Sequence, residues 1–213
     1  GEHNDAYYGE GIFVGYRNYE KRDIPVMYPF GHGLSYTQFE TEALEGAFLF
    51  DTEKEYVLKI PVRVKNIGNR TGSEVIQVYS RELHPHLLRP YKELAGYQKI
   101  YLLPGEECVV EVELRKDSFQ YYDPKLRDWV LPIGEHRLYI GTSSKDIFAE
   151  AKLTVKGKNP YVLNGDSTIE ELLQNAEAVK IVNEFSGGMF DVVTEEQLSF
   201  MRYRKLSDIL KMG

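Results

Sequence analysis

The 213-residue sequence lacks several features that would each point to a class of protein. One cysteine excludes an internal disulfide and favours a reducing compartment. No apolar stretch approaches the ~20 residues that a membrane span needs. The net charge is −7 and there is no long basic run, so we expect no nucleic acid as partner. GxSxG, P-loop and dinucleotide-binding glycine patterns are also missing, and we expect no cofactor.

The start of the sequence has neither a methionine nor a charged-then-apolar signal segment. It begins Gly1-Glu2-His3, which suggests a piece of a larger protein, although a tag or processing would look the same. Hydrophobic residues make up 42% of the chain, and tyrosine and phenylalanine are abundant. A folded core is therefore expected rather than disorder.

Residues 28–36, Tyr-Pro-Phe-Gly-His-Gly-Leu-Ser-Tyr, are the stretch around which the chain is organised. Gly31 and Gly33 can take positive φ and Pro29 fixes its own φ, which predicts a tight bend with buried rings. Residues 11–16 predict an apolar strand. Since a lone strand cannot bury two faces, we expect it to complete a sheet of an upstream domain. The residues to which we assign inter-domain packing are Phe13, Tyr16, Arg17, Phe30, His32, Leu34 and Tyr36.

From Phe39 to about Val155 the sequence alternates between apolar and polar residues. About seven such runs with turn signals between them predict a mainly β fold, an antiparallel β-sandwich of the immunoglobulin or fibronectin type III kind. The single cysteine favours the fibronectin-like variant. Cys108 falls in register with core positions, so we interpret it as a small buried hydrophobe. Gly96 interrupts the run 93–101 and marks a bulge.

After residue 158 the pattern becomes helical, and we expect one amphipathic helix that ends at Gly187-Gly188. Its capping box is Ser167 with Glu170 or Thr168 with Glu171. Thr194 with Gln197 predicts a second capping box. The apolar face of the first helix consists of Ile169, Leu172, Leu173, Ala176, Val179, Val182 and Phe185. This tail should pack on the sandwich, on a missing domain or on another copy of the chain.

Three domains follow from these patterns. Residues 1–38 are the terminal strand and linker of an upstream domain. Residues 39–157 are the fibronectin type III-like domain, and residues 158–213 are a helical C-terminal extension.

The sequence offers no convincing catalytic or metal-binding group. A retaining glycosidase needs two carboxylates about 5–5.5 Å apart, one of them protonated, whereas the carboxylates here mostly point outward or lie in turns. Capping or turn roles account for Glu10, Asp123 and Asp128. His84-Pro85-His86 has no third metal ligand at a plausible spacing. His32 is interpreted as a bend residue. We therefore predict no catalytic residue and no metal, and the substrate-binding residues stay unknown.

Five spaced segments resemble one enzyme family. GIFVGYRNYE at 11–20 and YPFGHGLSYTQFE at 28–40 are similar to the junction between the middle and C-terminal domains of the glycoside hydrolase family 3 β-glucosidases. Residues 62–79, 89–106 and 119–147 resemble the fibronectin type III-like domain of the same enzymes. The resemblance covers roughly residues 2–155. The tail is similar to a short helical extension of some bacterial members.

The resemblance implies that the chain is the C-terminal portion of such a β-glucosidase. The family cleaves terminal β-D-glucosides with retention, using an aspartate nucleophile on a (β/α)8 barrel and a glutamate acid/base in the α/β sandwich domain. Neither motif is in this sequence, so no catalytic role is transferred and the isolated chain should be inactive. The implied partners are the remaining catalytic domains, with the carbohydrate as their substrate, and a second copy in a homo-oligomer. The implied location is the bacterial cytoplasm, with secretion left open.

Two other functions are compatible with the same residues. A free-standing carbohydrate-binding module would stack sugars on exposed rings such as Trp129, Tyr121 or Tyr91, unless those rings belong to the core or to an interface. An adhesion or scaffold domain would associate through its helical tail. In family members whose domains are permuted, that tail would be a linker.

Overall fold

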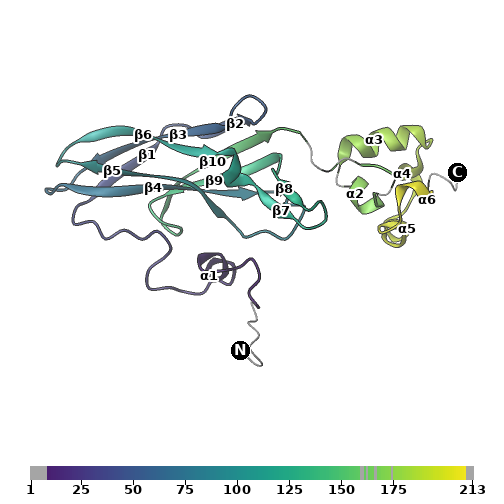
Figure 1. The fold of residues 1–213 in the computed structure, drawn as a ribbon, viewed down its shortest axis with the longest axis horizontal. Coiled ribbons are helices and arrows are strands. Elements are labelled where there is room, and N and C mark those ends of the chain that lie inside the picture. The colour runs from purple at the N-terminus through teal and green to yellow at the C-terminus, as the bar shows by residue number, and fades with distance from the viewer. Residues whose placement is uncertain (1–8, 159–160, 162, 166, 174, 210–213) are drawn as a thin grey trace. The chain divides into compact units, whose positions relative to one another are not determined.

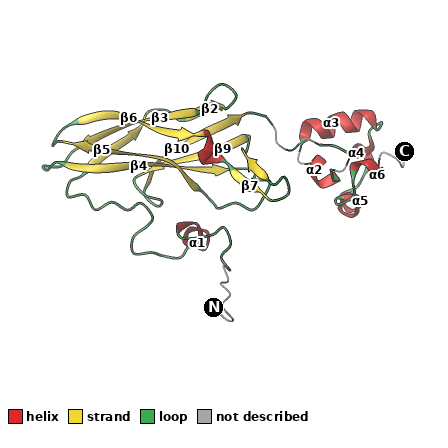
Figure 2. Ribbon diagram, in the orientation of Figure 1, coloured by secondary structure: helices red, strands yellow, loops and turns green. Residues whose placement is uncertain are grey.

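The computed structural model describes residues 9–158, 161, 163–165, 167–173 and 175–209. The chain divides into two compact units, Gly1–Asn159 and Pro160–Gly213. Each unit has a hydrophobic core of its own. The first is a β-sandwich and the second a group of short helices (Figure 1, Figure 2). The predicted mainly β class with a helical extension is confirmed.

Two sheets form the sandwich. One has the strand order β1-β3-β6, with bounds Phe39–Ala43, Val57–Asn66 and Glu107–Arg115. The other has the order β2-β10-β9-β4-β5, with bounds Ala47–Asp51, Ile147–Lys156, Gly134–Gly141, Gly72–Glu82 and Glu93–Leu102. The short 3-10 helix η2 (Lys116–Phe119) leads into a two-stranded ribbon of β7 (Tyr121–Asp123) and β8 (Asp128–Val130).

The core lies between the two sheets and uses the apolar faces that the alternation predicts. From β3, the buried residues are Leu58, Ile60, Val62 and Val64; the facing sheet contributes Ile76, Val78, Leu138, Ile140 and Leu153. Cys108 is half-buried and packs against this core. Burial raises the pKa of its thiol, so the thiolate is disfavoured and Cys108 acts as a small hydrophobe.

Strand β2 is the exception to the antiparallel arrangement. After β1 the chain crosses to the other sheet, where β2 pairs in parallel with β10, Phe50 opposite Val155. The sequence analysis did not identify this five-residue strand, because its alternation is too short to stand out. Phe50 is its one fully buried residue.

Gly96 lies where strand β5 of one sheet closely approaches strand β6 of the other. The predicted bulge is present, since the register of β5 against β4 shifts after the pair Gly96 and Val78. A Cβ atom at Gly96 would lie 2.4 Å from the carbonyl oxygen of Glu113 on β6. Strand β5 can therefore approach β6 because position 96 has no side chain.

The strand predicted at residues 11–16 is absent. Gly11 and Gly15 have φ of 57° and 60°, which break an extended chain, and the Phe13 N–H donates to the Glu10 carbonyl in a turn. The short helix α1 (Tyr16–Lys21) follows. A strand needs a partner for its backbone groups, and none of the described strands pairs with this stretch.

The second unit contains five short helices in the part of the chain that the structure describes. They are α2 (Ile169–Leu173), α3 (Ala176–Phe185), α4 (Met189–Val192), α5 (Glu195–Met201) and α6 (Leu206–Ile209). Their core is built on Ile169, Leu172 and Leu206.

The expected single helix is wrong, because Asn175 starts a new one. Its side-chain oxygen accepts a hydrogen bond from the Ala178 N–H at 3.0 Å, which caps α3. Phe185, predicted on the apolar face, is 90% exposed. Of the two capping frames, Thr168 with Glu171 forms both reciprocal hydrogen bonds. The second predicted box, at Thr194, is confirmed.

Substituting Gly96 by alanine should destabilise the sandwich by about 1–3 kcal/mol, since the new methyl group overlaps the β6 backbone. The matched control is Gly46→Ala. Position 46 has no atom within 4 Å of a new Cβ, so its change should stay within about 0.5 kcal/mol. Denaturant unfolding followed by Trp129 fluorescence measures both, and equal midpoints would contradict the close approach.

Candidate functional site

The tight bend that the sequence predicts is a four-residue turn. The N–H of His32 donates to the carbonyl oxygen of Pro29 at 3.0 Å. Gly31 has a φ of 82°, as the third position of a type II turn requires. Gly33, which was expected to share this conformation, has no positive φ.

The side-chain amide of Gln77 on β4 holds this turn against the sandwich. Its Nε2 donates to the carbonyl oxygens of Gly31 at 3.0 Å and Thr142 at 2.6 Å. Its Oε1 accepts from the Tyr79 hydroxyl at 2.6 Å. Gln77 is 3% exposed, so these partners replace the water that the amide loses on burial.

Two further features fix the turn. The Ser144 N–H donates to the Phe30 carbonyl at 2.8 Å. A Cβ on Gly31 would lie 2.0 Å from Gln77 Oε1. Both the positive φ and the lack of space therefore require glycine at position 31.

Aromatic rings tie helix α1 to the same place. The ring of Tyr16 stacks on Phe30 with centroids 4.6 Å apart, and it meets Tyr79 edge-on at 6.0 Å. The Tyr16 hydroxyl accepts from the Leu94 N–H at 3.0 Å. Burial raises the pKa of Tyr79, which keeps its hydroxyl protonated and able to donate to Gln77.

Ion pairs join α1 to the segment around β5. Lys92 lies 3.3 Å from Glu20, with their side chains 7% and 8% exposed, and Lys92 also donates to the Ser144 carbonyl. Arg17 pairs with Glu93 at 2.8 Å in a more exposed position. Because the Glu20–Lys92 pair is buried, the loss of either partner would leave an uncompensated charge.

The residues assigned to inter-domain packing separate into two groups. Tyr16, Arg17 and Phe30 contact the sandwich as described above. Phe13 is buried under the ammonium group of Lys21, which lies 3.5 Å from the ring centroid.

The other three residues face outward. His32 is exposed beside the ring of Tyr28, at 5.1 Å, while Leu34 and Tyr36 are 80% and 89% exposed. Whether any of the seven contacts another domain stays a prediction.

The sequence analysis missed Gln77, Glu20 and Lys92. Gln77 carried a signal, because it is the one polar residue in the run Val75–Tyr79. Glu20 and Lys92 lie 72 positions apart, and neither stands in a periodic pattern that would reveal its burial.

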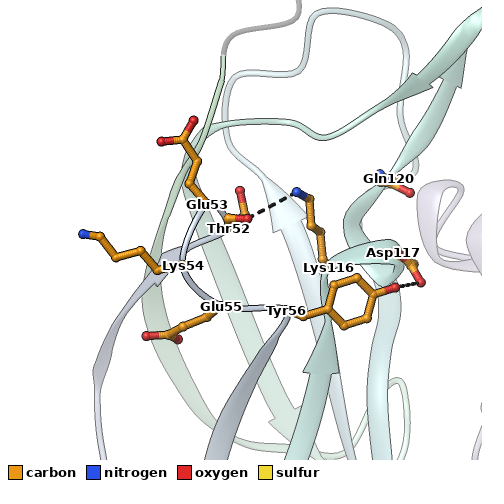
Figure 3. Close-up of a pocket in the computed structure, with 8 residues that line it drawn as sticks. All are labelled: Thr52, Glu53, Lys54, Glu55, Tyr56, Lys116, Asp117 and Gln120. Carbon is orange, nitrogen blue, oxygen red and sulfur yellow. Dashed lines mark hydrogen bonds between the residues drawn. The ribbon is translucent and has the colours of Figure 1, made fainter.

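A concave surface of about 410 Å³ lies elsewhere on the sandwich (Figure 3). It is lined by Thr52, Glu53, Lys54, Glu55, Tyr56, Lys116, Asp117 and Gln120. Lys116 donates to the Thr52 carbonyl at 3.2 Å, and the Tyr56 hydroxyl donates to Asp117. Its three carboxylates, Glu53, Glu55 and Asp117, are exposed to solvent, so the arrangement lacks the burial that keeps the acid of a glycosidase protonated.

Two groups beside one small cavity, Glu82 and His136, have strongly shifted pKa values. Burial raises the pKa of Glu82 to about 7 and lowers that of His136 to about 4. The ring of His136 bridges the Ser80 hydroxyl at 3.2 Å and the Pro132 carbonyl at 3.3 Å. The space beside them is about 20 Å³, far too small for a sugar ring. These groups are structural.

Within the described residues, no group of three or more histidine, cysteine or acidic side chains could hold a metal ion. None of the described helices is long and apolar enough to cross a membrane.

Comparison with known proteins gives a consistent result. Residues 74–144 match the model of the fibronectin type III-like domain. Thermostable beta-glucosidase B of Acetivibrio thermocellus is 37% identical over 186 residues, 85% of this chain and 24% of that protein. A beta-glucosidase of Kluyveromyces marxianus is 43% identical over 157 residues, 73% of this chain and 18% of that protein. The crystal structure of a GH3 beta-glucosidase from Bifidobacterium adolescentis superimposes with a TM-score of 0.68 at 36% identity, over 82% of this chain and 26% of that one.

The chain corresponds to a part of the glycoside hydrolase family 3 β-glucosidases. It spans about a quarter or less of the length of these relatives. The family resemblance of the sequence is thereby confirmed.

Gly31→Ala should release the turn from Gln77, because alanine disfavours the positive φ and its methyl group overlaps the amide. Hydrogen exchange at the Ser144 N–H, which is bonded to Phe30, should then become faster by at least about tenfold. Gly33→Ala is the control, since its Cβ would meet only Glu74, at 3.7 Å. If both variants exchange like the parent chain, the turn is not held as described.

The free energy of unfolding should depend on pH through the titration of His136 and Glu82. Since its folded pKa of about 4 lies below the ordinary 6.5, the folded chain binds fewer protons and is destabilised as pH falls from 6.5 to 4. Glu82 acts oppositely between pH 4.5 and 7, because its folded pKa of about 7 is raised. Glu82→Gln should therefore lose stability on acidification more steeply than the parent chain. Denaturant unfolding at pH 4.5, 5.5 and 6.5 measures both proteins. An equal loss of unfolding free energy on acidification in the variant and the parent chain would contradict this prediction.

Proposed function

We propose that this chain is a non-catalytic part of a β-glucosidase that hydrolyses terminal β-D-glucosides with retention of configuration. Its task is to support the catalytic domains of that enzyme. The relatives named above are β-glucosidases several times longer than this chain. In the part of the chain that the structure describes, neither the concave surface at Tyr56 nor the small cavity at Glu82 offers a pair of carboxylates suited to acid and nucleophile roles.

The observation that carries the proposal is the docked segment between α1 and β1. The hydrogen bonds of Gln77 hold this segment to the sandwich, and the Glu20–Lys92 pair holds the preceding helix α1. The segment also exposes large apolar side chains, which are Met27 at 86%, Tyr28 at 62%, Leu34 at 80% and Tyr36 at 89%. Apolar groups displayed on a fixed segment are typical of an interaction surface, and we propose that the catalytic domains cover it.

Three further points belong to the same proposal. The carbohydrate is the substrate of the parent enzyme rather than of this part. A homo-oligomer and a cytoplasmic location rest on the family resemblance and on the single cysteine.

The isolated chain, incubated at high concentration with p-nitrophenyl β-D-glucoside, should release no nitrophenol above a blank. In the full-length enzyme, Leu34→Asp combined with Tyr36→Asp should lower the thermal midpoint by several degrees, because the charges would be buried at the interface. The same pair in the isolated chain is the control and should leave the midpoint unchanged. Turnover by the isolated chain, or equal effects in both settings, would overturn the proposal.

A further inference from the structure

The ribbon of β7 and β8 has two different faces. Tyr122 pairs directly with Trp129, so their side chains share one face. Tyr121 and Val130, the neighbouring pair, lie on the other. Val130 is 2% exposed, whereas Trp129 is 63% and Tyr122 51% exposed. One face anchors the ribbon and the other displays two rings.

Local contacts hold this ribbon in a fixed shape. Asp123, 1% exposed, accepts hydrogen bonds through Oδ1 from the N–H groups of Lys125 and Leu126 at 2.7 and 3.1 Å. The rings of Tyr122 and Trp129 meet edge-on, with centroids 6.0 Å apart and planes at 76°. The ring faces are therefore ordered before anything binds, which reduces the entropy lost on binding.

We propose that Trp129 and Tyr122 form a binding site for a pyranose ring of a β-linked gluco-oligosaccharide. The C–H face of such a ring packs on the exposed indole, while its hydroxyl groups need polar partners at the rim. The exposed Asp128 and Arg127, next to the indole in the sequence, supply an acceptor and a donor. Tyr122 closes one side of the platform.

The size of the ring pair favours a small ligand over a protein. A fully buried aromatic side chain covers ~150–250 Å², so the exposed parts of these two rings amount to roughly 250 Å² together. A stable protein interface needs about 800 Å² from each partner. Charged and exposed residues, Lys125, Arg127 and Asp128, lie in or next to the turn that joins the two strands and limit any apolar extension there.

The other two rings that the sequence suggested for sugar stacking are already engaged. The guanidinium of Arg89 lies 4.4 Å from the ring centroid of Tyr121. That of Arg81 lies 4.2 Å from Tyr91, whose hydroxyl also contacts Tyr139 at 3.2 Å. The structure therefore replaces Tyr121 and Tyr91 by Tyr122 as the companion of Trp129. The choice of a β-linked glucose ligand rests on the proposed function. The pair of exposed rings that would bind it follows from the structure alone.

The test titrates the 213-residue chain with cellotriose, laminaritriose and, for comparison, the α-linked maltotriose. Trp129 is the single tryptophan of the sequence, so its fluorescence reports this site without interference, and calorimetry measures the same affinity in variants that lack it. A saturable change with cellotriose or laminaritriose is expected. Trp129→Ala and Tyr122→Ala should each weaken binding by about tenfold or more.

Tyr101→Ala is the matched control, because Tyr101 is 68% exposed on β5, where it pairs with Ser73 of β4 and not with the ribbon, and it should leave affinity unchanged. Circular dichroism checks that each variant folds. No saturable signal by either method overturns the site, as does equal affinity in all three variants. Equal affinity for maltotriose overturns the β-linked ligand. Cleavage of the sugars would instead overturn the proposed function, which keeps the two failures distinct.

Discussion

The amide of Gln77 is the interaction on which the first unit depends. Gln77 is buried on the face of its sheet that points away from the core. Both of its polar side-chain atoms nevertheless have partners, which are the carbonyl groups of Gly31 and Thr142 and the hydroxyl of Tyr79. An unpaired buried amide would cost about 1–3 kcal/mol. The bend, the loop and strand β4 are consequently positioned together, and the rings and ion pairs of helix α1 pack on a surface that is already formed.

Much of the sandwich could be predicted because its residues repeat every two positions. The alternation in strand β3 predicts one apolar face made of Leu58, Ile60, Val62 and Val64, and all four are buried in the structure. Strand β2 could not be found this way, since its five residues are too few for the alternation to stand out. The strand expected at 11–16 failed for the opposite reason. Its apolar composition was real, but Gly11 and Gly15 turn the backbone away from an extended path.

The docked bend illustrates the limit of sequence reasoning at a site. The proline, glycine and aromatic residues predicted a rigid turn, and Gly31 makes this turn possible through its positive φ. The surface that receives the turn consists of single polar residues on distant strands, such as Gln77 and Lys92. Their burial follows from three-dimensional packing and leaves no periodic trace. The same holds for Tyr122, whose exposed face depends on the register of a three-residue strand.

The parallel pairing of β2 with β10 also bears on how the chain acquires its shape during synthesis. Residues 47–51 find their neighbour at residues 152–156, so the early strand must wait until more than a hundred further residues have left the ribosome. Such distant pairing lowers the rate of folding, because the entropy of closing the long loop between β2 and β10 is lost before their contacts stabilise the chain. Until then Phe48 and Phe50 lack the strand beside which they pack in the folded chain, and exposed apolar side chains of this kind make an incomplete chain prone to aggregation.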